Sequence, residues 1–232
     1  MIDRVDVFIF LDDVQYVDRG WQNRNRIRKA ARSSEAKWLT VPVRKTSKKK
    51  KAKIKDIEIC WDRNWIVQHR AALFETYRRA PYFDAYFELL CEWLQPRSEE
   101  ERLSELNIRI IENLCQTFGC GAEIVRSSQL KVLGSKNARL IGICNCVGAE
   151  VYLANNGAMP YIVGKEFQEA GVGFTFQNYR HPWYDQGLGS FASHLSVLDA
   201  VFHVGPNTVD LIREGRPDEW EDKILWPKGN IN

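Results

Sequence analysis

The second half of the chain alternates between two kinds of segment, and this alternation limits the possible folds more than any other feature of the sequence. Short runs of β-branched and aromatic residues are followed by stretches with apolar residues at helical spacing. Strands that alternate with helices of about 10–15 residues are typical of βαβ units in a largely parallel sheet. The predicted strands are 122–128, 150–154 and 172–179, and the predicted helices are 135–149, 161–171, 194–205 and 207–215.

The first half adds three strands and a helical block to this pattern. Residues 5–11 form a short apolar run of the kind that is buried on both faces of an α/β sheet, and 38–43 and 55–59 are predicted as two further strands. Apolar residues at helical spacing predict three helices within 62–119, the last of them ending at Gly119. We therefore predict an α/β fold with a Rossmann-like, largely parallel sheet, helices on both faces and a helical insertion at about 62–119.

The size and composition of the chain fit a globular protein with a sizeable core. Of its 232 residues, 44% are hydrophobic and 27% are charged, and the net charge is only +3. The basic excess gathers at 44–55, but no aromatic residues interleave with the lysines at 48–51, which favours a solvated loop over a nucleic-acid site. We predict a single domain over 1–215 and a C-terminal tail over 216–232, and we do not expect nucleic acid as a partner.

The cysteines and histidines argue against a structural metal site. The six cysteines include no C-x-x-C pair, and the chain has only four histidines. No signal peptide precedes the run "VDVFIFL", and no segment reaches the roughly 20 apolar residues that a membrane-spanning helix needs. We therefore expect a cytoplasmic protein with reduced thiols, no metal ion and no membrane span.

Two adjacent carboxylates, Asp12 and Asp13, follow the first predicted strand directly. Ligands of open α/β sheets bind outside the carboxyl ends of the strands. One of the two carboxylates could therefore bind a sugar hydroxyl, an ammonium group or a metal ion, or act as a base. The alternative is structural: Asp13 caps the next turn, and Asp12 pairs with Arg24 or Arg26.

The segment "WQNRNR" brings together side chains that suit an anionic, ring-containing ligand. If the segment is extended, Arg24 and Arg26 share one face, and Asn23 and Asn25 share the other. A guanidinium group matches phosphate or carboxylate, an amide can bind hydroxyl groups, and Trp21 could stack on a sugar or a base. The alternative is an ordinary solvated strand with Arg–Asp pairs.

Two loops are further candidates. Asn156 and Gly157 follow a predicted strand and begin a helix, where backbone N–H groups can hold an anion, although a plain tight turn is the default interpretation. The loop "YRHPWYDQGLGSF" is rich in glycine and aromatic residues, contains His181, and leads to His194. Such a loop could close over a ligand.

The predicted helix at 194–205 places Ser196, Asp199 and His203 on one face. These residue types suggest a catalytic triad, but triads are normally assembled from separate segments, whereas residues along one helix face lie about one turn apart. We therefore favour a polar face that meets a cleft or solvent. Ser196 and Asp199 could still bind substrate there.

Four segments of the sequence resemble the WbqC-like proteins: "FLDDVQYVDRGWQNRNRI", "WLTVPV", "APYF" and "SVLDAVFHVGP". The resemblance covers residues 1 to about 213, and the first segment is its most specific part. Members of this family are found with genes for O-antigen and other bacterial surface polysaccharides, and they are described as glycine (aminoacyl) transferases or as uncharacterised. The family motifs fall here on Asp12, Asp13, Gln15, Trp21, Asn23, Arg24, Asn25, Ser196, Asp199 and Gly205.

The resemblance also predicts a segment that is not found here. Family members begin with a strand and turn resembling Q-P-x-Y-x-P-W, and this chain opens where that segment should already have ended. If the segment forms one wall of the ligand site, we expect a truncated product or a misplaced start with impaired activity. The lost strand would then leave an exposed sheet edge.

The resemblance implies a transferase that moves an aminoacyl or acyl group, such as glycyl, onto an amino sugar of a surface polysaccharide. In this interpretation Asp12 or Asp13 is catalytic, and the substrate is a nucleotide-linked amino sugar. The alternatives are an ATP-dependent, carboxylate-activating or nucleotidyl-transferring enzyme, and a non-catalytic binding protein or remnant. The cofactor and the oligomeric state stay unknown at this stage. The predicted substrate-binding residues are Gln15, Trp21, Asn23, Arg24, Asn25, Arg26, Asn156, Gly157, Ser196 and Asp199.

Overall fold

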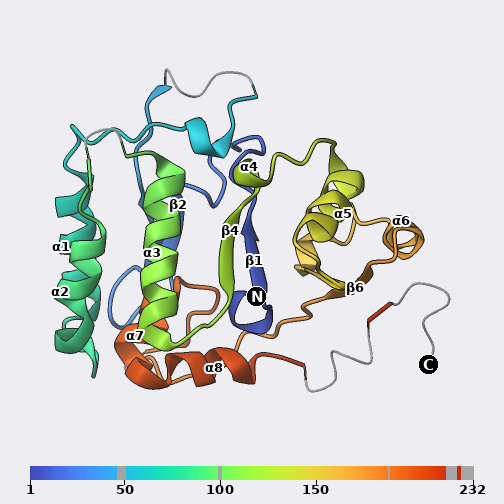
Figure 1. Ribbon diagram of the computed structural model, residues 1–232. Coiled ribbons are helices and arrows are strands. Elements are labelled where there is room, and N and C mark those ends of the chain that lie inside the picture. The colour runs from blue at the N-terminus through green and yellow to red at the C-terminus, as the bar shows by residue number, and fades with distance from the viewer. Residues whose placement is uncertain (46–50, 99–100, 188, 218–223, 226–232) are drawn as a thin grey trace. The chain divides into compact units, whose positions relative to one another are not determined.

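The computed structural model describes residues 1–45, 51–98, 101–187, 189–217 and 224–225 (Figure 1). Strands and helices both occur along the chain, which confirms the α/β class. The lysines at 48–50 and most of the predicted tail over 216–232 lie outside the described residues.

The chain divides into two compact units. The first comprises residues 1–11, 120–180 and the chain from 215 onward, and the second comprises 12–119 and 181–214. The predicted helical insertion at 62–119 therefore belongs to a larger unit that also holds a later segment of the chain. A single domain over 1–215 stays a prediction, because the division into units does not say whether the two fold independently.

The first unit contains the parallel strand pairs. β1 (Val7–Phe10) pairs with β4 (Glu123–Arg126), and β5 (Val151–Ala154) pairs with β6 (Gly173–Phe176), both in parallel. The helices of this unit pack a core around Phe167, which is fully buried. They are α4 (Ser127–Leu130), α5 (Lys136–Cys146) and α6 (Gly164–Glu169), with short 3₁₀ turns at η1 (Ile2–Arg4) and η4 (Asn156–Ala158).

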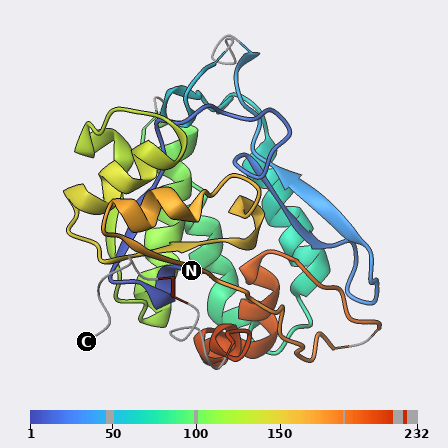
Figure 2. The ribbon, with the colours of Figure 1, turned by 90° about the vertical axis from the view of Figure 1, so that its right-hand side faces the viewer.

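The second unit is mainly helical and carries one antiparallel hairpin, β2 (Arg24–Arg28) with β3 (Ala36–Thr40). The hairpin lies against helices α1 and α2, and Ile27 of β2 is buried among their side chains (Figure 2). The Tyr77 ring stacks on Phe202 at 4.8 Å in the same core. The helices are α1 (Trp65–Tyr77), α2 (Phe83–Trp93), α3 (Leu103–Phe118), α7 (Val197–Val204) and α8 (Thr208–Glu214), with 3₁₀ turns at η3 (Ile54–Asp56) and η5 (Gly205–Asn207).

The strand pairing is less extensive than we predicted. Within the described part of the chain, the strands form three two-stranded sheets, and one of these is antiparallel. The strands have only four or five residues each, so each pair makes few ladder hydrogen bonds. The structure thus confirms short parallel sheets combined with helices, whereas one Rossmann-like sheet is not confirmed.

The predicted strand at 55–59 is wrong. Residues 54–56 form a 3₁₀ turn, and Glu58 and Ile59 make only isolated bridges, to Arg102 and Val43. The alternating pattern did identify the buried side chains, since Ile57 and Ile59 both lie in the core. The alternation of apolar and charged residues therefore predicted which side chains are buried, but it did not predict a continuous ladder of strand hydrogen bonds.

No helix in the described ranges combines the length and the apolar character that crossing a membrane requires.

His69 makes the stability of the second unit depend on pH. It is buried in α1, with its ring 5.1 Å from Trp65 and a hydrogen bond to the Thr40 backbone. Burial lowers the pKa of His69 to about 4 from 6.5, so the unfolded chain takes up the proton first as the pH falls. We expect the free energy of unfolding to decrease by up to about 3 kcal/mol between pH 6.5 and 4.

Urea unfolding at a series of pH values measures this effect. The His69→Gln variant is the reference, because its amide can still donate to the Thr40 carbonyl but does not titrate. Carboxylates contribute equally to the pH dependence of the two proteins. The difference between the two curves of unfolding free energy against pH is therefore the contribution of the His69 imidazole. Parallel curves between these pH values would contradict the prediction.

Candidate functional site

One face of β2 carries a row of three arginines. Arg24, Arg26 and Arg28 alternate along the strand, so their side chains leave the hairpin on the same side. Ile27 points to the opposite side and is buried in the helical core. The register places Trp38 of β3 directly opposite Arg26. The row therefore lies on the side of the hairpin away from the core.

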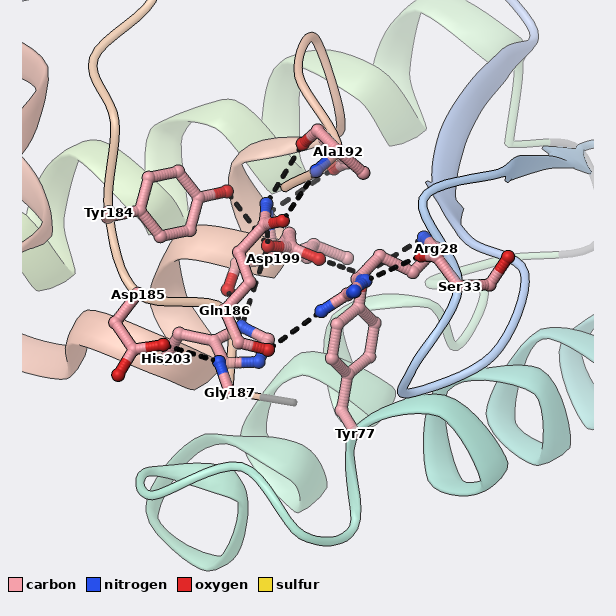
Figure 3. A network of polar contacts seen from close by, with 12 residues as sticks. Arg28, Ser33, Tyr77, Tyr184, Asp185, Gln186, Gly187, Ala192, Asp199 and His203 are labelled. Atoms are coloured by element: carbon pink, nitrogen blue, oxygen red, sulfur yellow. Dashed lines mark hydrogen bonds and ion pairs between the residues drawn. The ribbon is translucent and has the colours of Figure 1, made fainter. Parts of the chain in front are cut away.

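Arg28, at one end of the row, is committed to the fold. Its side chain is only 1% exposed, and its guanidinium group donates three hydrogen bonds to backbone carbonyl oxygens (Figure 3). Nη1 donates to Gln186 at 2.7 Å, Nη2 to Ser190 at 3.2 Å and Nε to Ser33 at 3.0 Å. These bonds fasten the segment 186–190 to the hairpin.

Arg24 and Arg26 lie against two exposed indole rings. The Arg24 guanidinium carbon is 4.2 Å from the centre of the Trp38 ring, and that of Arg26 is 5.4 Å from the Trp21 ring. The two rings are 4.9 Å apart, with Trp21 61% exposed and Trp38 42% exposed. We call these four side chains the Trp–Arg face.

Both arginines of the Trp–Arg face keep unused hydrogen-bonding capacity. One terminal nitrogen of Arg24 donates to the Arg19 carbonyl, and one of Arg26 donates to the His194 carbonyl at 2.9 Å. The Nε atom of each is buried without a hydrogen-bond partner among the described residues, so the second terminal nitrogen of each is the donor left for a ligand. No carboxylate of the described residues forms an ion pair with either arginine. Guanidinium groups beside exposed aromatic rings suit a ligand that carries both phosphate and a planar ring.

Asp199 is the centre of a buried hydrogen-bond network (Figure 3). Its carboxylate is fully buried and accepts hydrogen bonds from Tyr77 and Tyr184 at 2.8 Å and from the Gln186 amide at 2.9 Å. His203 donates to the Asp199 backbone carbonyl at 2.8 Å. Burial, followed by the charge of Asp199, raises the pKa of both phenols well above its usual value, so both remain donors.

The segment 181–196 runs along β2 and closes against it. The Ser196 N–H donates to the Arg26 carbonyl at 2.7 Å, and the Gln186 side chain pairs with both backbone groups of Ala192. Gly189 has a φ of 105°, and a Cβ there would lie 2.4 Å from the Arg32 carbonyl oxygen. The predicted glycine-rich loop is therefore packed against the hairpin.

Of the predicted site residues, the structure brings Trp21, Arg24 and Arg26 together. Asn23 lies beside them but is buried, and its amide donates to the Val41 carbonyl at 3.0 Å, which extends the hairpin. Asn25 is exposed, and its Oδ1 accepts from the Arg26 N–H at 2.8 Å. Of the two asparagines predicted to share a ligand-facing side, Asn23 is used in the hairpin and Asn25 is exposed.

The segment that contains Asp12, Asp13 and Gln15 pairs through its backbone with residues 53–55. The buried Asp12 accepts a backbone hydrogen bond from Lys55 at 2.7 Å, and Gln15 forms a bridge with Lys53. Asp13 lies between them and is half-buried. The described contacts of Arg24 and Arg26 involve backbone carbonyls and rings, so the alternative in which Asp12 pairs with one of these arginines stays a prediction.

The other predicted residues have local roles. Asn156 and Gly157 form a 3₁₀ turn of the first unit, and Asn156 Oδ1 accepts from the Asn178 N–H at 2.9 Å. Ser196 caps α7 through the Leu198 N–H at 3.4 Å. No group of three or more His, Cys, Asp or Glu side chains in the described ranges is placed to hold a metal ion.

The prediction that the polar face of α7 meets a cleft or solvent is wrong at Asp199. Its carboxylate is enclosed, because two tyrosines and a glutamine from other segments cover it. Ser196 is used for capping and lies outside this network. Asp199 and His203 therefore stabilise the fold together, since His203 Nδ1 donates to the Asp199 carbonyl, whereas Ser196 acts separately as a cap.

Sequence reasoning missed Trp38 and the buried partners Arg28, Tyr77, Tyr184 and Gln186. Arg28 continues the two-residue spacing of the other arginines, and Trp38 stands in a predicted strand, so both had a detectable signal. Tyr77 comes from α1, Tyr184 and Gln186 come from the irregular segment before α7, and no local pattern links them to Asp199.

Two hollows in the described surface are lined by other residues. A groove of about 610 Å³ between α1 and α2 has apolar walls that include Phe74 and Phe87, with the Arg70–Glu88 ion pair at its rim. A smaller hollow of about 340 Å³ is formed by residues 2–6 with 121–122 in the first unit. We therefore treat the Trp–Arg face as an open binding surface.

Removing the Asp199 carboxylate should destabilise the second unit strongly. Asp199→Ala leaves two phenols and an amide without their acceptor in a buried site, so we expect a loss of about 3–5 kcal/mol in the free energy of unfolding. Tyr77→Phe removes one donor to the carboxylate and a long 3.4 Å acceptor of the Arg28 N–H, and it should cost about 1–2 kcal/mol. Urea unfolding followed by tryptophan fluorescence measures both values.

Asp210→Ala is the matched control for this experiment. Asp210 is an exposed carboxylate in α8 whose ion pair with Arg213 is 3.2 Å long, so its loss should cost less than about 1 kcal/mol. Equal stability of the Asp199 and Asp210 variants would show that the buried network contributes nothing.

Comparisons with known proteins place the chain in one family. The family model described as "WbqC-like protein family" matches residues 1–211. A protein of Mycobacterium tuberculosis (strain ATCC 25618 / H37Rv), named "Uncharacterized protein Rv1507c", is 32% identical over 219 residues, which cover 92% of this chain and 90% of that protein. No solved structure matches significantly. The chain therefore belongs to the WbqC-like protein family.

Proposed function

We propose that the protein is a transferase of surface-polysaccharide biosynthesis. It binds a nucleotide-linked amino sugar on the Trp–Arg face and moves an aminoacyl or acyl group, such as glycyl, onto the amino group of that sugar. The observation that carries the proposal is the pair of guanidinium groups, Arg24 and Arg26, that lie against two exposed indole rings and form no ion pair with a carboxylate of the described residues. Membership of the WbqC-like family, whose members are described as aminoacyl transferases of surface-polysaccharide biosynthesis, supports the reaction class.

The physical case rests on what the Trp–Arg face leaves exposed. Large aromatic side chains are costly to expose, and tryptophan and arginine are enriched where proteins bind partners. Arginine forms bidentate hydrogen bonds with phosphate, and the indole offers a flat surface for a base or a sugar ring. Nucleotide-linked sugars combine these two chemical features in one molecule.

The remaining predicted residues differ in how well they could contact the substrate, because some are exposed and others are buried or used in the fold. Asn25, which is exposed beside Arg26, is the better candidate for contacting sugar hydroxyls, since the Asn23 amide is used in the hairpin. Asp13 is the better candidate for the proton acceptor, because Asp12 is buried. Gln15 and Ser196 remain proposed contacts, and Asp199 could act only indirectly. Asn156 and Gly157 belong to the first unit and stay a separate prediction of an anion site there.

Two broader expectations accompany the proposal. A substrate of this kind places the protein in the cytoplasm. The parallel pairs β1–β4 and β5–β6 support a Rossmann-like arrangement within the first unit, which is a common framework for nucleotide binding.

Binding of nucleotide-linked sugars tests the assignment directly. Calorimetric titration of the whole chain with UDP-linked amino sugars should show binding, and Arg24→Gln should weaken it about tenfold or more through the loss of a charge-assisted hydrogen bond to phosphate. Trp21→Ala should weaken binding of the whole compound more than that of inorganic pyrophosphate, because only the former has a ring to stack.

Arg78→Gln is the matched control for the arginine. The Arg78 guanidinium also lies over an aromatic ring, 5.7 Å from Phe74, but at the end of α1 and not on the Trp–Arg face. Its substitution should leave affinity unchanged. Equal affinities of the Arg24 and Arg78 variants would refute the binding role. Binding of ATP with release of pyrophosphate would favour carboxylate activation instead.

A further inference from the structure

Two imidazole rings lie together at the ends of the segment 181–194. The ring centroids of His181 and His194 are 5.0 Å apart, with a tilt of 35° between the ring planes. Aromatic side chains support the pair, since His181 also contacts Phe191 at 6.0 Å and Tyr184 at 6.5 Å. The segment that holds both histidines is itself held by Arg28 and by the Asp199 network. We call the two rings the His pair.

The contacts of His181 fix which of its ring nitrogens is available. Its Nδ1 lies 2.9 Å from the Pro182 carbonyl oxygen, which can only accept, so Nδ1 carries the proton. In the neutral ring Nε2 is then the atom that can gain a proton. His194 is exposed, and its Nδ1 lies 2.9 Å from the Ser193 hydroxyl. The nearest carboxylate to exert charge on His181 is Asp199, which already accepts three hydrogen bonds.

The His pair is joined to the Trp–Arg face through the backbone. The His194 carbonyl accepts from Arg26 Nη2 at 2.9 Å, and the next turn is fixed by the Ser196 N–H bond to the Arg26 carbonyl. His194 has a φ of 57°, in the left-handed region that a residue with a Cβ adopts at an energetic cost. Strained backbone of this kind persists where the surrounding contacts determine it, and it is often found at functional sites.

We propose that the His pair is a second phosphate-contacting subsite beside Arg26, so that the surface takes a nucleoside diphosphate in preference to a monophosphate. This inference rests on the proposed function, because it assigns the first phosphate to the Trp–Arg face. It adds the residues that contact the second phosphate and a pH dependence that the proposed function does not contain.

The charge of the subsite depends on whether phosphate is bound. Burial lowers the pKa of His181, and the nearby His194 lowers it further, so the free His181 ring is mostly neutral at pH 7. A phosphate at the pair favours the protonated His181 ring, and binding therefore takes up a proton. The charged and titratable groups around the pair are Arg26 and Arg28 from β2, Asp199 and His203 from α7, and Tyr184 from the segment itself.

Calorimetric titrations with UDP and with UMP at about pH 6 and about pH 8 test the subsite. The wild-type chain should prefer UDP by about tenfold at the lower pH, and this preference should shrink at the higher pH as His181 loses its proton. The double variant His181→Gln with His194→Gln should lose the preference at both pH values while it still binds UMP. Circular dichroism confirms that the variant is folded.

A second measurement separates the imidazoles from the ligand, whose own phosphate titrates near pH 6. Repeating the UDP titration in buffers of different ionisation enthalpy counts the protons taken up, and the wild type should take up more than the double variant. A double variant that keeps the UDP preference and the proton uptake overturns the subsite and leaves the proposed function standing. A wild-type chain that binds neither nucleotide at either pH refutes both.

Discussion

The arrangement of the second unit depends on two buried charges that do not touch each other. Arg28 and Asp199 are joined through Gln186, whose carbonyl accepts from the guanidinium and whose amide donates to the carboxylate (Figure 3). Burying either charge alone would cost several kcal/mol, so each must be satisfied by hydrogen bonds. Their donors and acceptors come from β2, α1, α7 and the segment 181–194, and the network is complete only when all four are in place.

The network around Arg28 and Asp199 explains how the arginines of β2 serve both the fold and a ligand surface. Arg28 lies under the segment 186–190, Arg26 gives one nitrogen to its end at His194, and Arg24 lies beyond it against Trp38. The later segment therefore covers only the Arg28 end of β2. The guanidinium groups of Arg26 and Arg24 are partly exposed to solvent. The same contact holds His194 in its left-handed conformation, so the position of the imidazole ring follows from a bond that Arg26 makes.

Local patterns were enough to predict much of the fold. Helical spacing located α1, α2 and α3, and Gly119 ends α3 with a φ of 70°, as expected for a helix terminated by glycine. Strand pairing was not accessible in the same way, because it depends on partners far away in the chain. Residues 55–59 show the limit: their alternation predicted burial correctly, but their neighbours offer only single bridges.

The candidate site, too, was predictable where its residues are close in sequence and not where they come from distant segments. Arg24, Arg26 and Trp21 are close in sequence, and the two-residue period of a strand is enough to group the arginines. Asp199 was misjudged because no local pattern identifies its covering residues: Tyr77 lies 122 positions earlier in the chain, and Tyr184 and Gln186 stand in an irregular segment 15 and 13 positions before it. Polar side chains on a helix face look alike in sequence whether they are enclosed or exposed. Burial separates the two cases: a fully enclosed carboxylate with three internal donors is closed to a ligand, whereas partly exposed guanidinium groups that form no ion pair with a carboxylate of the described residues remain open to one.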